Sequence, residues 1–83
     1  MTLEGGIARV QYVVVLRDNE WKIAFDGKHF GPYPSQRAAI GAAVNAAHTA
    51  GGQGHDAQVL VQGRDNKFRT EWTYGHDPYP PPG

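Results

Sequence analysis

The pattern of apolar and polar positions predicts five short strands and one helix. Residues 9–16, Arg-Val-Gln-Tyr-Val-Val-Val-Leu, are rich in β-branched and aromatic side chains and predict the first strand. Its second half, residues 12–16, is apolar at every position, so we expect both faces of this strand to be covered. One face can lie under a helix, whereas the other needs the C-terminal residues or a partner chain.

A hairpin is predicted after this strand. The turn residues Arg17-Asp18-Asn19-Glu20 lead into residues 21–25, where Trp, Ile and Phe alternate with Lys and Ala and predict a strand with one apolar face. Asp26-Gly27 is a strong signal for a two-residue turn. Residues 28–30 then return as a short third strand, which the prolines of Gly31-Pro32-Tyr33-Pro34 end.

An alanine-rich helix is predicted next. Ser35 is a good N-cap, and the apolar residues after it recur at helical spacing, at Ile40, Ala43, Val44 and Ala47. Gly51-Gly52 is the predicted C-terminal end. Gly41 costs about 1 kcal/mol relative to alanine inside a helix. A tight contact with the sheet would explain it, and drift would explain it equally well.

The second half of the chain predicts another hairpin and a tail. Residues 57–62 and 67–73 are the two strands, and in the later one we expect Phe68, Thr70 and Trp72 to share one face. The Tyr- and Pro-rich residues 74–83 predict an extended, polyproline-like segment. The predicted organisation is a lead-in over 1–8, one α+β domain over 9–73 and a tail over 74–83.

Composition narrows the function classes. The 83 residues fit one domain, and eight Lys and Arg balance eight Asp and Glu, which argues against bulk duplex DNA or an anionic membrane as partner. There is no cysteine, so disulfides and thiolate metal sites are excluded. The first residues lack the basic and then apolar run of a signal peptide, and no stretch has the ~20 apolar residues of a membrane span. We expect a cytoplasmic protein.

The order of these segments resembles the bacterial family known as domain of unknown function 2188. The resemblance rests on Trp21-x-Ile23 with Phe30, on the helix opening at 35–40, on the strand and turn of 59–68 and on the ending Tyr74-Gly75-His76-Asp77-Pro78-Tyr79-Pro80-Pro81. It departs from the family in Arg37-Ala38-Ala39, where an acidic residue usually precedes the alanine, and in Asp65-Asn66, where the family usually has Asp-Gly. The resemblance implies a compact α+β domain and carries over no activity, catalytic residue or cofactor.

Four histidines are candidates for chemistry: His29, His48, His55 and His76. Two of them precede an aspartate, but adjacent residues rarely face each other as a catalytic pair must, and no nucleophile accompanies them. Their spacing does not match a set of metal ligands. We interpret them as solvated loop histidines and expect no enzyme activity, no metal and no cofactor.

Two surfaces are candidates for binding. Lys22, Lys28, Arg64, Lys67 and Arg69 could give a basic sheet surface for single-stranded nucleic acid, although acidic residues lie close by in sequence. Tyr79, among prolines, could dock in an aromatic groove of another protein, or the tail could pack on its own domain or across a dimer. We favour packing.

The sequence therefore predicts an α+β protein with an antiparallel sheet of four to five strands and one helix on a face, in the order β-β-β-α-β-β. The two hairpins could form one sheet in a monomer or meet across a dimer. We expect a non-enzymatic binding or assembly module, with itself as a homodimer partner and a protein partner that the sequence does not identify. The alternative is a weak nucleic-acid binder that uses the basic residues of the two hairpins.

Overall fold

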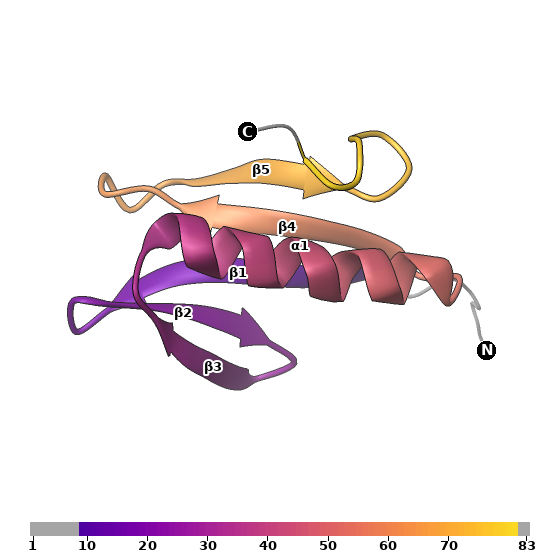
Figure 1. The fold of residues 1–83 in the computed structure, drawn as a ribbon. Coiled ribbons are helices and arrows are strands. Elements are labelled where there is room, and N and C mark those ends of the chain that lie inside the picture. Colours follow the sequence, from indigo (N-terminus) through magenta and orange to yellow (C-terminus); the bar gives the residue numbers. More distant parts are fainter. Residues whose placement is uncertain (1–8, 82–83) are drawn as a thin grey trace.

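The computed structural model describes residues 9–81 and places in them one five-stranded sheet with one helix across it (Figure 1). The elements are β1 Arg9–Arg17, β2 Glu20–Phe25, β3 Lys28–Tyr33, α1 Gln36–Gly52, β4 Asp56–Gln62 and β5 Phe68–Thr73. This confirms the predicted α+β class and the predicted order of elements. The predicted lead-in, residues 1–8, lies outside the described residues, as do residues 82–83.

Both hairpins belong to one sheet of a single chain, with the strand order β3-β2-β1-β4-β5. Neighbouring strands are antiparallel except for β1 and β4, which are parallel. The parallel pair has a topological cause. Two antiparallel steps make β3 parallel to β1, and α1 then carries the chain across the sheet so that β4 starts again at the same end.

The two turns of the first half of the sheet have the backbone that their sequences predict. Asp18 and Asn19 join β1 to β2 with φ of 52° and 62°, and Asp26 and Gly27 join β2 to β3 with φ of 52° and 75°. Positive φ at two successive residues is the type I′ geometry, whose twist matches that of the strands it joins. These turns fix the register of Val14 opposite Ile23 and of Ile23 opposite Phe30.

Helix α1 starts and ends as predicted, but its C-terminal cap differs from the prediction. The Ser35 Oγ accepts a hydrogen bond from the Ala38 amide at 3.0 Å, as an N-cap does. The helix ends at Gly52, as predicted, but the glycines do not cap it, because the C-cap residue is Gln53. Gly54 has φ of 96°, its amide donates to the Gly51 carbonyl, and the His55 amide donates to the Ala50 carbonyl, which together form a Schellman cap.

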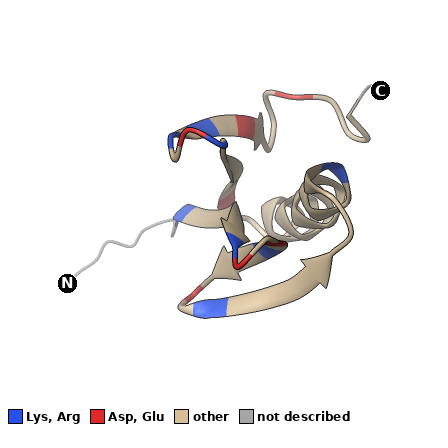
Figure 2. Ribbon diagram, turned by 90° about the vertical axis from the view of Figure 1, so that its left-hand side faces the viewer, with Lys and Arg blue, Asp and Glu red and all other residues tan. Residues whose placement is uncertain are grey.

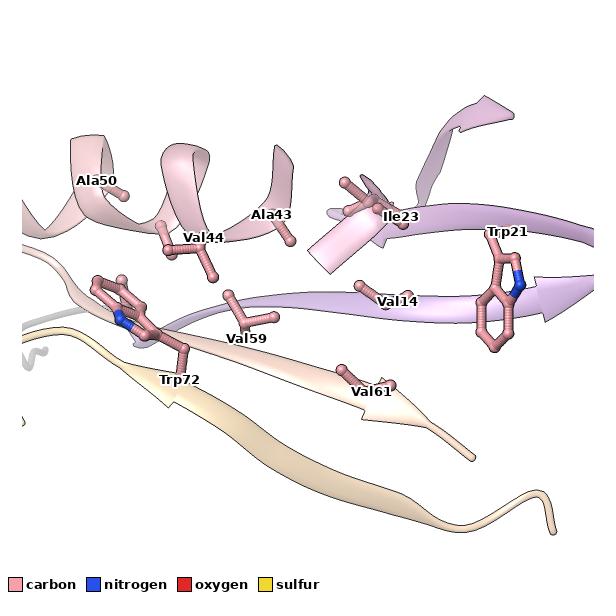
Figure 3. Close-up of a cluster of buried hydrophobic side chains, with 12 residues drawn as sticks. Val14, Trp21, Ile23, Ala43, Val44, Ala50, Val59, Val61 and Trp72 are labelled. Atoms are coloured by element: carbon pink, nitrogen blue, oxygen red, sulfur yellow. The ribbon is translucent and has the colours of Figure 1, made fainter. Parts of the chain in front are cut away.

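The core lies between α1 and one face of the sheet (Figure 3). Its centre is made of small and β-branched side chains, with Val14, Val44, Val59 and Val61 fully buried. Trp21 and Trp72 lie toward opposite ends of this layer (Figure 3). Ile40 is partly buried and packs against this core. A Cβ at Gly41 would meet nothing within 4 Å, which excludes a tight contact with the sheet and leaves drift as the explanation of that glycine.

A bulge in β5 changes which of its residues face the core. Val59 pairs with Trp72 but Leu60 pairs with Thr70, so Glu71 has no partner on β4. Trp72 therefore shares the core face with Val59, whereas Phe68 and Thr70 lie with Gln62 and Leu60 on the opposite face. The expectation that Phe68, Thr70 and Trp72 share a face is wrong, and Phe68 is 54% exposed.

The sheet face away from the helix carries the other half of the apolar β1 positions. Val13 pairs with Ala24 and Leu60 there, and Val15 pairs with Lys22. Val15 is 5% exposed, while Val13 and Leu60 are half-buried. The Gln62 side chain extends the sheet at this face: its Oε1 accepts from the Leu16 amide and its Nε2 donates to Asn66. We call this surface the open sheet face.

Candidate functional site

A pocket of about 240 Å³ lies between α1 and the β2–β3 side of the sheet. Four elements supply its lining, and the only polar side-chain groups in that lining are two tyrosine hydroxyls. The lining residues are Tyr12 of β1, Ile23 and Phe25 of β2, Phe30 and Tyr33 of β3, and Ala42 and Ala46 of α1. We call this site the aromatic groove.

The groove exists because the helix covers only part of the sheet. Helix α1 packs mainly on β4 and β1, and the β2–β3 hairpin projects beyond it (Figure 1). Ala42 and Ala46 are one helical turn apart, so they line the same flank of α1. Because their side chains are small, they leave open the space that a larger residue would fill.

A second bulge puts two aromatic residues of β3 on the groove side. Phe30 pairs with Ile23 and Tyr33 pairs with Trp21, so Gly31 and Pro32 together oppose Lys22. Gly31 has φ of 125°, a backbone conformation that favours glycine. The bulge lets Phe30 and Tyr33, three residues apart, project from the same face of the sheet. Sequence reasoning missed this, because it ended the strand at Phe30.

The rings of the groove are held in defined positions. Tyr12 and Phe25 stack on each other, with ring centroids 4.3 Å apart and an interplanar angle of 5°. Phe30 forms part of the rim and is 45% exposed. Drug-sized ligands occupy pockets of about 300–1,000 Å³, so this groove is sized for one or two large apolar side chains. Chemically the arrangement suits uptake of an apolar group.

The opposite flank of α1 carries a second aromatic cluster, formed by His48, Trp72, Tyr74 and Tyr79. The His48 and Tyr79 rings stack with centroids 3.7 Å apart, and the Trp72 ring meets both of them nearly edge-on. His48 is half-buried in this cluster, which differs from the expectation of a solvated loop histidine. We call these four residues the tail cluster.

Hydrogen bonds fix the C-terminal residues to the tail cluster. The Trp72 indole donates to the Pro78 carbonyl at 2.9 Å, and the Tyr79 hydroxyl donates to Asn45 of the helix at 2.7 Å. The chain does not run extended from Tyr74 as predicted. It turns over residues 74–77, where the Thr73 amide donates to the Asp77 carboxylate at 2.8 Å. The tail therefore packs on its own domain, over Trp72 and the helix, and leaves the open sheet face uncovered.

The predicted basic residues lie on different faces and at different ends of the sheet. Lys22 pairs with Val15 on the open sheet face, whereas Lys28 pairs with Phe25 and Arg69 with Val61 on the helix side. Arg64 and Lys67 belong to the loop between β4 and β5, at the end of the sheet opposite to the turn that precedes Lys28.

Acidic residues accompany several of these cations (Figure 2). Lys22 lies 3.7 Å from Glu20, and Arg69 lies 3.5 Å from Glu71. The five predicted residues therefore do not form one basic surface, and Tyr79, the sixth predicted contact residue, is engaged by Asn45 and His48.

The other three histidines belong to three different segments: β3, the loop after α1 and the turn after β5. Within residues 9–81, no group of three His, Asp or Glu side chains is placed to hold a metal ion. No helix among these residues is long and apolar enough to cross a membrane.

Sequence reasoning did not identify the groove residues as a site. Their spacing in the sequence gives little sign of it, since the strand aromatics also fit an ordinary core. One signal was available: Ala42 and Ala46 follow the same helix flank beside the buried Ala43 and Ala47. Alanine on a helix flank that faces strand aromatics leaves space that the domain does not fill.

The chain belongs to the family described as "Uncharacterized protein conserved in bacteria (DUF2188)", whose match covers residues 11–74. This agrees with the resemblance inferred from the sequence. The matched range includes every groove residue and ends at Tyr74, before Pro78 and Tyr79 of the packed tail. No curated protein and no solved structure matches the chain.

Proposed function

We propose that this DUF2188 protein is a non-enzymatic binding module that takes up an apolar segment of another cytoplasmic protein in the aromatic groove. The observation that carries the proposal is an open groove of about 240 Å³ whose lining is apolar apart from two hydroxyls. Half-exposed Phe30 gives an incoming side chain a ring to pack on. The lining offers no carboxylate, imidazole or amine, which supports binding rather than catalysis.

The neighbouring edge strand favours an extended peptide as the bound segment. Strand β3 is at the edge of the sheet, so the backbone groups on its outer side are not used by the sheet. Peptides often add to such an edge and place alternate side chains in adjacent pockets. Pro32 lacks an amide hydrogen, so the pairing would be confined to the first half of the strand. A short segment with one or two large apolar residues fits these limits.

The test is binding of a fluorescein-labelled peptide, acetyl-Gly-Leu-Phe-Leu-Gly-amide, measured by fluorescence anisotropy. We expect saturable binding with a Kd on the order of 100 µM, as for a small and transient interface. Ala46→Leu fills the groove and should abolish binding. Gly41→Leu is the matched control, because it adds the same side chain to the same helix where nothing lies within 4 Å. Equal binding by both variants would contradict the proposal.

Self-association through the open sheet face is a second candidate function, favoured by one observation. Phe68 is 54% exposed on that face beside half-buried Leu60, and the packed tail does not cover either residue. Sedimentation equilibrium should then give a mass that rises with protein concentration, and Phe68→Ser should weaken the association. A constant monomer mass up to millimolar protein would exclude it.

The nucleic-acid alternative stays a prediction. Anisotropy with labelled single-stranded DNA at low and moderate salt tests it, because phosphate contacts weaken steeply as salt rises.

A further inference from the structure

The acidic residues of the chain are unevenly distributed. All eight Asp and Glu lie outside residues 27–55: Glu4, Asp18, Glu20, Asp26, Asp56, Asp65, Glu71 and Asp77. The acid-free stretch comprises β3 and α1, the two elements that form the outer wall and the helical wall of the aromatic groove. Figure 2 shows no acidic residue on either element. The chain as a whole has a formal net charge of zero, but the two elements that wall the groove carry no Asp or Glu.

Lys28 is not itself a lining residue, but it lies beside the groove, opposite the lining residue Phe25. It is the first residue of β3 and pairs with Phe25, so both side chains leave the sheet on the groove side. Of the four other strand cations, all but Arg17 form an ion pair with a carboxylate: Arg9, Lys22 and Arg69. The Lys28 side chain forms no ion pair or hydrogen bond with any of residues 9–81. Asp26, in the turn beside it, is the acidic residue nearest in sequence.

A lysine beside an apolar groove makes the affinity for a ligand depend on the charge of the ligand's flanking residues. A ligand that fills the groove brings its flanking residues toward Lys28, where a carboxylate is attracted and an ammonium group is repelled. Rejection of the wrong charge contributes to specificity as much as attraction of the right one. The apolar lining alone cannot make this distinction.

We infer that the groove selects apolar peptide segments flanked by acidic residues, and that Lys28 reads the flanking charge. The inference rests on the proposed function, because it names the class of partner for the same groove. Lys28 determines which flanking charge is preferred, and the aromatic lining supplies the affinity for the apolar centre of the segment.

The experiment uses two labelled peptides with the same apolar centre, acetyl-Glu-Leu-Phe-Leu-Glu-amide and acetyl-Lys-Leu-Phe-Leu-Lys-amide, in anisotropy titrations. Wild type should bind the acidic peptide about fivefold more tightly, since one exposed charge pair contributes modestly. Lys28→Glu should reverse the preference. Lys67→Glu is the matched control, since it makes the same charge change on the β4–β5 loop and should keep the preference for the acidic peptide. The preference should shrink as salt is raised from 50 to 500 mM.

The outcomes separate the two proposals. Equal binding of both peptides to wild type, with binding lost in Ala46→Leu, would overturn the role of Lys28 and leave the groove as the binding site. Loss of the preference in Lys67→Glu as well as Lys28→Glu would assign it to net charge and overturn the inference. Binding of neither peptide would overturn both the inference and the proposed function. Circular dichroism of each variant establishes that it is folded.

Discussion

Aromatic side chains lie beside both flanks of helix α1, but the C-terminal segment packs on only one of the two flanks. On the flank toward β5, Trp72 and Tyr74 meet the helix, and the packed tail brings Tyr79 onto His48. On the flank toward β3, Tyr12, Phe25, Phe30 and Tyr33 surround a pocket of about 240 Å³. Each edge strand carries a bulge that directs an aromatic residue toward its flank. Within residues 9–81, the C-terminal residues fill one flank and no segment fills the other.

The difference shows what an occupied flank looks like in this fold. On the β5 side, Trp72 is 2% exposed, with the rings of His48, Tyr74 and Tyr79 against it and its indole bonded to the Pro78 carbonyl. On the open flank, none of residues 9–81 lies over the aromatic side chains in this way. The tail is thus an intramolecular precedent for the ligand that we propose for the aromatic groove.

The largest expected difference between the flanks is in stability. Trp72→Ala removes a buried indole from the closed flank and should lower the free energy of unfolding by about 3–5 kcal/mol. Phe30→Ala removes a half-exposed ring from the open flank and should cost less than about 1.5 kcal/mol. Urea unfolding followed by circular dichroism measures both. Similar losses in the two variants would mean that the flanks are equally closed.

Removal of residues 78–83 should have the next largest effect. It takes away Tyr79 and the Pro78 carbonyl, so the Trp72 indole loses both its acceptor and a ring that packs against it. We expect a loss of about 1–3 kcal/mol, because one hydrogen bond is lost and the apolar surface under Tyr79 becomes exposed to water. Thermal unfolding of the truncated chain checks this. An unchanged melting temperature would show that the tail adds nothing to the closed flank.

Alanine substitutions at two glycines of the helix should change the free energy of unfolding by smaller amounts and in opposite directions. A Cβ at Gly51 would overlap the Tyr74 ring of the tail cluster, so Gly51→Ala should cost about 1–3 kcal/mol by overpacking. A Cβ at Gly41 would meet nothing within 4 Å, so Gly41→Ala should gain up to about 1 kcal/mol from helix propensity. Urea unfolding of both variants gives the sign of each change. If both substitutions stabilise the protein, Tyr74 is not packed on Gly51.

The sequence predicted the elements of this fold well because their signals are local. The Asp18-Asn19 and Asp26-Gly27 turns, the Ser35 cap and the alternation over 21–25 each act within a few residues. What failed depends on contacts between distant segments. The β5 bulge that exposes Phe68 is set by pairing with β4, and the parallel pairing of β1 with β4 is set by the crossover through α1.

The site was harder to predict than the fold for the same reason. Tyr12, Phe25 and Phe30 are strand aromatics, and a sequence does not say which of them the helix will cover. The basic residues were visible in the sequence, but their grouping required a sheet in which Lys28 and Arg69 were neighbours. The order β3-β2-β1-β4-β5 places them on opposite edge strands. The family match does not resolve this, since its description names no function.

The most direct test of the groove as a binding site is chemical-shift mapping of the isotope-labelled protein by NMR during titration with acetyl-Gly-Leu-Phe-Leu-Gly-amide. Our account predicts that the largest shifts fall on amides of Phe25, Phe30, Ala42 and Ala46, with the Trp72 indole signal unchanged. Shifts concentrated on Leu60 and Phe68 of the open sheet face, or on the tail cluster, would contradict it.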